Sequence, residues 1–190
     1  MTIPLFTNPI GATIKNVICS DVDIRTGSNV GAICDQASGA TRIYNCGVLS
    51  GSINGTGNVG GLVGLITGSS EVRVVNCFNY ANVSGGNYAA GIVGKNEGTV
   101  GDVRIALCMM YGNVTGATNI SPVYGGNHVS NVSNFTEYNY WLYSTTGADG
   151  KKILKILSYT AYNDQLAIEK EEYLTRFPFY RHIQIGRAHV

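Results

Sequence analysis

The sequence GNVGGLVG at residues 57–64 decides the fold of this chain. Related stretches lie on either side of it, SNVGAIC at residues 28–34 and GNYAAGIVG at residues 86–94. A second phrase alternates with them and ends successively at Cys46, Cys77 and Cys108, each 31 residues after the last. A period near 30 residues is typical of proteins built from stacked repeats. We therefore expect these three cysteines to occupy equivalent positions, one above another.

Each repeat contains three short extended pieces separated by Gly, Asn or Ser. In the second unit they span residues 42–46, 51–53 and 58–63, and none is long enough to predict a helix. One turn of such a chain cannot bury its own inward face, but neighbouring turns can bury one another's. The pattern predicts an all-β protein, a parallel β-solenoid (β-helix) of about four coils, which we expect to wind in the right-handed sense.

The repeat also predicts which side chains stack. Three inward columns are expected, formed by Ile43, Val74 and Ile105, by Val30, Val59 and Tyr88, and by Cys34, Val63 and Val93. Two asparagine columns are expected at the corners, formed by Asn16, Asn45 and Asn76 and by Asn29, Asn58 and Asn87. Stacked amides can donate to and accept from one another, and Asn tolerates the left-handed backbone that corners need.

Composition excludes several classes of function. Charged residues make up only 13% of the chain and the net charge is +1, which gives no electrostatic case for binding nucleic acid or an anionic membrane. No apolar run approaches the roughly 20 residues of a transmembrane helix. The first residues contain no basic region followed by an apolar core, so no signal peptide is visible.

The five cysteines suggest buried thiols and no disulfide framework. Metal binding would require CxxC pairs or His companions, which are absent, so no metal or cofactor is predicted. GTGNVG at residues 55–60 matches a dinucleotide fingerprint, but another strand follows it where a helix would be needed. Asp21 and Asp23 are expected on one strand face, as solvated carboxylates or, alternatively, as Ca²⁺ ligands.

The chain divides by composition. Residues 1–150 are assigned to the solenoid, whose last coil contains an aromatic cluster of Tyr138, Tyr140, Trp141 and Tyr143. Large aromatic side chains can close the open end of a solenoid, or alternatively form a platform on which carbohydrate stacks.

Residues 151–184 bring charges that the earlier part lacks. Asn163 and Asp164 can cap a short helix running to about Phe177, ended by Pro178, which we interpret as a docking element or the start of a further module. Residues 185–190, IGRAHV, resemble the translation of a common short-read sequencing adapter, so we interpret them as an artefact. The natural protein is then expected to continue past Gln184.

Two four-residue motifs resemble those of a known family of repeats. Gly61, Leu62, Val63 and Gly64, and again Gly91, Ile92, Val93 and Gly94, alternate with the pairs Asn45–Cys46 and Asn76–Cys77 in the manner of GLUG-motif repeats. Such repeats occur in large bacterial surface proteins, including IgA-specific peptidases, adhesins and many cell-surface proteins of Bacteroidetes. The first copy, GAIC at residues 31–34, departs from the motif, with Ala and Cys replacing glycines.

The resemblance implies an extracellular or cell-surface location and transfers no catalytic residue. The leading hypothesis is a non-catalytic structural or adhesive repeat region, a rigid surface that binds a host glycan or surface protein. The alternative is part of a carbohydrate-active β-helix enzyme or of a surface peptidase. Glycoside chemistry would need a carboxylate pair at a set separation, and the acidic residues here are sparse and do not recur in one column.

Overall fold

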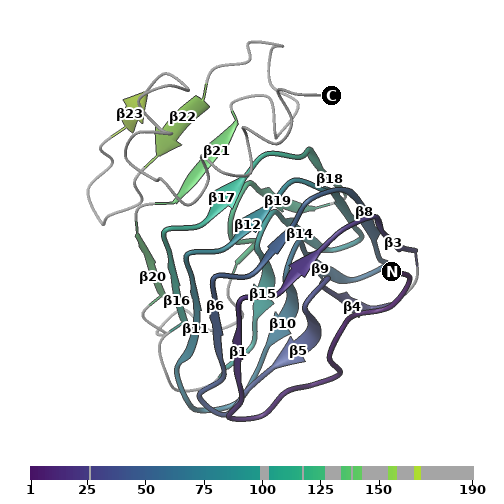
Figure 1. The fold of residues 1–190 in the computed structure, drawn as a ribbon, viewed down its shortest axis with the longest axis vertical. Coiled ribbons are helices and arrows are strands. Elements are labelled where there is room, and N and C mark those ends of the chain that lie inside the picture. Colours follow the sequence, from purple (N-terminus) through teal and green to yellow (C-terminus); the bar gives the residue numbers. More distant parts are fainter. Residues whose placement is uncertain are drawn as a thin grey trace.

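The computed structural model describes residues 1–25, 27–98, 103–116, 118–126, 134–137, 139–142, 154–157 and 165–167. Within these residues the chain is all-β and winds as a parallel β-solenoid of about three turns (Figure 1). The described part contains no helix, and so none of a length and hydropathy that could cross a membrane. The predicted fold class is therefore confirmed, while the right-handed winding stays a prediction.

Three turns each contain five short strands. The first comprises β1 (Thr13–Lys15), β2 (Ile18–Cys19), β3 (Val22–Ile24), β4 (Asn29–Val30) and β5 (Cys34–Ala37). The second comprises β6 (Arg42–Tyr44), β7 (Gly47–Val48), β8 (Gly51–Asn54), β9 (Asn58–Gly60) and β10 (Val63–Ile66). The third comprises β11 (Val72–Val75), β12 (Phe78–Asn79), β13 (Asn82–Gly85), β14 (Tyr88–Ala90) and β15 (Val93–Asn96).

The following turn is less complete. It contains β16 (Val103–Ala106), β17 (Met109–Met110), β18 (Val114–Gly116) and β19 (Asn119–Ser121), and an isolated bridge between Val93 and Tyr124 stands where its fifth strand would be. Strands β20 (Asn134–Glu137) and β21 (Tyr140–Leu142) then continue two of the sheets. The predicted count of four coils is not confirmed, because only three described turns contain all five strands.

Equivalent strands of successive turns pair in parallel and form five sheets along the solenoid. In Figure 1 the strands β1, β6, β11, β16 and β20 lie side by side along one side of the molecule, in that order. Their register places Ile14, Ile43, Val74 and Ile105 opposite one another. The first predicted column is thus confirmed, as is the column of Cys34, Val63 and Val93.

The expectation of three extended pieces per turn is wrong, because a corner divides one of them and a further strand, β7, follows another. Asn45, with a φ of 53°, ends the run predicted over residues 42–46 at Tyr44, and Asn45 and Cys46 separate β6 from β7. Gly61 and Leu62 separate β9 from β10 and break the run predicted over residues 58–63. Each turn therefore has five short sides in place of three longer ones.

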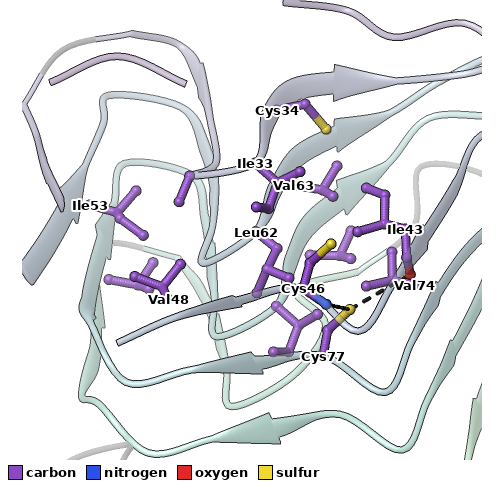
Figure 2. Close-up of a cluster of buried hydrophobic side chains, with 14 of the residues drawn as sticks. Ile33, Cys34, Ile43, Cys46, Val48, Ile53, Leu62, Val63, Val74 and Cys77 are labelled. Atoms are coloured by element: carbon purple, nitrogen blue, oxygen red, sulfur yellow. Dashed lines mark hydrogen bonds between the residues drawn. The ribbon is translucent and has the colours of Figure 1, made fainter. Parts of the chain in front are cut away.

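The core is a stack of aliphatic side chains and thiols supplied by every turn. Figure 2 shows Ile33, Leu62 and Val63 projecting between the strands toward Ile43 and Val74. All five of these side chains are fully buried. Burying an Ile, Leu or Val side chain is worth about 1.5–3 kcal/mol relative to exposure, before conformational entropy is subtracted. This recurring burial holds successive turns together.

The two ends of the solenoid differ. Ahead of the first turn, Leu5 and Phe6 donate backbone hydrogen bonds to the carbonyls of Ala32 and Ile33. The N-terminal segment therefore runs alongside the first turn without forming strands of its own. At the other end β22 (Leu154–Leu157) pairs antiparallel with β21, and β23 (Gln165–Ala167) pairs antiparallel with β22. The helix predicted from about residue 163 to Phe177 is not confirmed: its described residues form β23, and the others lie outside the described part, as do residues 185–190.

Candidate functional site: repeat residues and the outer surface

Gly61 and Leu62 of the first motif form the corner between β9 and β10, Val63 and Gly64 begin β10, and all four residues are buried. A Cβ atom on Gly61 would lie 1.9 Å from the Gly91 carbonyl oxygen and 2.2 Å from the Asn79 amide nitrogen. Leu62 donates its backbone N–H to the carbonyl of Ile92 in the next turn and accepts a bond from Ile33 in the previous one. The motif is therefore occupied with closing the corner and stacking the turns.

Gly91 and Ile92 of the second motif form the equivalent corner between β14 and β15, Val93 and Gly94 begin β15, and all four residues are buried. A Cβ atom on Gly91 would lie 2.1 Å from the Pro122 carbonyl oxygen, and one on Gly94 would lie 2.5 Å from the Gly64 carbonyl oxygen. Neither motif presents a side chain to solvent, so neither can by itself bind a ligand.

The first copy of the motif is aligned differently from the expectation. The register places Cys34 opposite Val63, so Ala32 occupies the position of Gly61, and Asp35 that of Gly64. Only Ala32 replaces a motif glycine in the way that was predicted, and Cys34 replaces a valine. The corners share one backbone hydrogen bond, because Ile33 donates to Leu62 as Leu62 donates to Ile92 one turn later, whereas Ala32 donates to the Gly61 carbonyl and Gly61 to that of Ala90.

Cys46, Cys77 and Cys108 form the predicted column, and all three are buried thiols that take part in no disulfide. The Cys46 backbone N–H donates to Cys77 Sγ at 3.4 Å, and the Cys77 thiol donates to the Ile43 carbonyl at 3.6 Å (Figure 2). Burial raises the pKa of Cys77. The hydrogen bond with Cys77, and then burial, raise the pKa of Cys46. Thiols held protonated in this way are poor nucleophiles and poor metal ligands.

Asn139 continues the cysteine column and was not anticipated. It is 1% exposed; its Oδ1 accepts from the Cys108 backbone N–H at 2.9 Å and its Nδ2 donates to the Ile105 carbonyl at 2.8 Å. The signal in the sequence is its position 31 residues after Cys108. Both polar atoms of the amide are satisfied, which permits an Asn among apolar neighbours.

One asparagine ladder is confirmed and the other is confirmed only in part. Asn45 Nδ2 donates to Asn16 Oδ1 at 3.1 Å and Asn76 Nδ2 donates to Asn45 Oδ1 at 2.7 Å. In the second ladder Asn58 Nδ2 donates to Asn29 Oδ1 at 2.9 Å.

The third member predicted for that second ladder is wrong. Tyr88, and not Asn87, lies opposite Asn58, and Ala89 lies opposite Val59. The spacing between these strands is 30 residues, whereas it is 29 in the previous turn. Tyr88 consequently lies outside the inward column to which it was assigned, and Lys95 Nζ lies 4.7 Å from the centre of its ring.

The aromatic cluster remains a prediction. Tyr140 and Trp141 belong to β21 and pair with Met109 and Met110, which places both at the end of the solenoid. Tyr138 and Tyr143 lie outside the described residues.

Asp21 and Asp23 do not share a strand face. Asp23 lies in β3, whereas Asp21 precedes it with a φ of 51°. The Asp21 carboxylate accepts from the Ser50 hydroxyl at 3.0 Å, and that of Asp23 accepts from Arg25 Nε at 2.8 Å. The Arg25 hydrogen bond lowers the pKa of Asp23. No group of three or more His, Cys, Asp or Glu side chains in the described part is arranged to hold a metal ion.

The outward side chains contain a feature that the sequence analysis missed. Arg42, Arg73 and Arg104 lie opposite one another on β6, β11 and β16, on the solvent side of the first sheet. The signal was the arginine three residues before each Asn–Cys pair and its equivalent, Leu107–Cys108. Arg73 forms an ion pair with Glu71, and Arg42 and Arg104 are exposed.

The comparisons with known proteins give one partial match. A stretch of 60 residues is 40% identical to the immunoglobulin A1 protease of Streptococcus sanguinis. It covers 32% of this chain and 3% of that relative, so this chain corresponds to a small part of the length of the curated protein that it matches. No family model matches the chain, and no solved structure matches it either. The resemblance to GLUG-motif repeats is therefore not confirmed.

Proposed function

We propose that this chain is a non-catalytic structural and adhesive repeat region of a secreted or cell-surface bacterial protein. Its role is to present a rigid β-solenoid surface to a host glycan or surface protein. The resemblance to GLUG-motif repeats and the partial match to a bacterial IgA1 protease support this assignment.

The observation that carries the proposal is the division of labour between repeated and variable residues. The residues that recur from turn to turn, in the two glycine motifs and the cysteine column, are buried and close corners or fill the core. Other outward positions of the same strands vary, as where Tyr44 stands opposite Lys15 and Val75, although the outward arginine recurs at Arg42, Arg73 and Arg104. A scaffold that fixes its interior and varies its exterior is suited to display.

The proposal predicts that the chain binds a glycan or surface protein without cleaving it. The full chain is applied to an array of host glycans and purified surface glycoproteins, and the bound polysaccharides are then assayed for newly released reducing ends. We expect saturable binding to at least one ligand and no release of reducing ends. An absence of binding to every member of the array contradicts the proposal.

The partial match favours one second candidate, a non-catalytic segment of a surface peptidase. The matched relative is named an immunoglobulin A1 protease, and 60 residues of this chain align with it. Under this alternative the chain binds immunoglobulin A1 without cleaving it. Saturable binding to immunoglobulin A1 with no affinity for the glycan array would favour the peptidase segment over the adhesive region.

A further inference from the structure

Cys46, Cys77 and Cys108 occupy one position in three successive turns. The strands on either side of this position, β6 and β7, pair with β11 and β12, which pair in turn with β16 and β17. The spacing between paired residues is 31 on both sides of the column, so the register does not slip there. Cys77 therefore lies directly opposite a cysteine in the turn before it and in the turn after it.

The fold holds neighbouring cysteines of this column at a separation that suits a disulfide. Adjacent strands of a sheet are about 4.8 Å apart, and the Cα atoms of two cysteines joined by a disulfide are usually about 4.4–6.8 Å apart. Cys46 and Cys108 are two turns apart, roughly twice the strand spacing, which is beyond the limit of about 7 Å for a disulfide. Within the column, only pairs that include Cys77 therefore fit.

The sulfur atoms already lie against the preceding turn. Cys77 Sγ accepts from the Cys46 backbone N–H at 3.4 Å, and the Cys77 thiol donates to the Ile43 carbonyl at 3.6 Å (Figure 2). One turn later the Cys108 thiol donates in the same way to the Val74 carbonyl at 3.5 Å. Because all the sulfurs lean in the same direction, a bond between two of them requires one cysteine to rotate about its Cα–Cβ bond into another staggered rotamer.

We propose that Cys77 forms a disulfide with one of its two neighbours in the column, a covalent bond between successive turns, when a low-molecular-weight disulfide such as glutathione disulfide is the oxidant. A cysteine thiolate attacks one sulfur of glutathione disulfide and releases a glutathione thiolate. The second cysteine thiolate then attacks the protein sulfur of this mixed disulfide and releases the other glutathione thiolate. Two cysteine thiols are oxidised, one glutathione disulfide is reduced to two glutathione molecules, and these take up the two protons.

The exchange takes place before the turns close. All three cysteines of the column are 0% exposed, and the thiolate is the reactive form, so the step belongs to the unfolded or partly folded chain. The secreted or cell-surface location proposed above provides the oxidising surroundings in which disulfides persist. The bond closes a loop one turn long and stabilises the solenoid by restricting the unfolded chain. The inference concerns the scaffold and does not depend on which ligand the surface binds.

The test counts thiols after refolding. The full chain is unfolded in urea and refolded in a mixture of reduced and oxidised glutathione at about pH 8, near the pKa of an unfolded cysteine. Free thiols are then alkylated in urea and counted by mass spectrometry. We expect the count to fall from five to three, and peptide mapping to place Cys77 in the disulfide. We also expect the oxidised protein to unfold at a higher urea concentration than the reduced protein.

Alanine variants separate the column from chance pairing, with circular dichroism to verify the β fold. Cys77→Ala should abolish the disulfide, as should the double variant Cys46→Ala with Cys108→Ala, whereas each of these last two changes alone should retain it. Cys34→Ala is the matched control, because Cys34 is equally buried in another column. An unchanged thiol count in the parent chain, a disulfide that includes Cys19 or Cys34, or a disulfide that persists in Cys77→Ala would overturn the proposal. A lower urea midpoint in the oxidised protein would do the same, since the native turns would then not accommodate the bond.

Discussion

Asn16, Asn45 and Asn76 adopt a left-handed backbone conformation, with φ of 60°, 53° and 54°. This conformation costs most residues about 1–2 kcal/mol, and Asn is among the few that tolerate it. Each corner therefore selects Asn for its backbone, and the stacked amides then bond to one another. Leu107 occupies the same position one turn later and has a φ of 55°.

We expect the exchange of these residues to change stability in opposite directions. Asn76→Leu should lower the free energy of unfolding by about 1–2 kcal/mol, because it places a branched side chain in the left-handed region and breaks the ladder. Leu107→Asn should raise it by up to about 1 kcal/mol, less any packing lost by the half-buried Leu side chain. Urea unfolding at neutral pH measures both changes. A loss of stability in Leu107→Asn together with no change in Asn76→Leu would contradict this account.

The buried thiols predict a loss of stability in alkaline solution. Cysteine in an unfolded chain has a pKa of about 8.5, and burial raises the pKa of Cys77 and Cys34 in the native protein. Above pH 8.5 or so the native state binds more protons than the unfolded state, so the free energy of unfolding falls as pH rises. Below that pH these groups are protonated in both states and contribute no pH dependence.

Urea unfolding between about pH 7 and pH 10 measures this slope, because tyrosines begin to titrate near the upper limit. Cys77→Ala is the matched variant: it lowers stability at every pH but should show a shallower decline. A thiol-reactive disulfide reagent should label the native protein slowly and the urea-unfolded protein rapidly. A decline of equal slope in Cys77→Ala would show that other groups cause the pH dependence.

At the scale of the strand and its corner, Gly61 of the glycine motif has no room for a side chain. Gly61 faces the Gly91 carbonyl oxygen and the side chain of Asn79 of the next turn. The equivalent residue of the first turn is Ala32, and the register places Val48 where the third turn has Asn79. Alanine is therefore accepted at one corner and excluded at the next, although Ile33 and Leu62 donate equivalent backbone hydrogen bonds at the two corners.

This difference predicts unequal effects of two small substitutions. Gly61→Ala should lower the free energy of unfolding by about 3 kcal/mol or more, since the added methyl would overlap backbone atoms that cannot move without separating the turns. Ala32→Gly, the reverse change at the equivalent corner, should cost only about 0.5–1 kcal/mol. Urea unfolding of the two variants measures the contrast. Similar effects in both would show that the corner can relax around a methyl group.

At the scale of the whole molecule, each turn contacts only its neighbours. Strands β6 and β11 have parallel partners on both sides, whereas β1 is the edge of its sheet. In such arrays stability is approximately a sum of contributions from each repeat and each interface between neighbours. The central turns should therefore be the most protected part of the solenoid.

Amide hydrogen exchange can test this gradient. We expect the slowest exchange in β6–β15, with faster exchange in β1–β4, because opening the first turn breaks one interface and opening a central turn breaks two. Uniform protection from β1 to β15 would show that the array opens as a single unit and not turn by turn.

The sequence alone determined the all-β solenoid, the cysteine column, one complete asparagine ladder and two of the three inward columns. A period is a local property, so any residue that recurs at that period stacks when the chain winds once per repeat. The tertiary structure decided where the period slips, because the residues between paired strands number 29, 30 or 31, and only the pairing shows which strand absorbs the change. Tyr88 and Asn87 were misplaced for that reason. The arginine column recurs at the same period and directly precedes the inward residues Ile43, Val74 and Ile105, so the alternation of side chains along a strand already indicated its outward side.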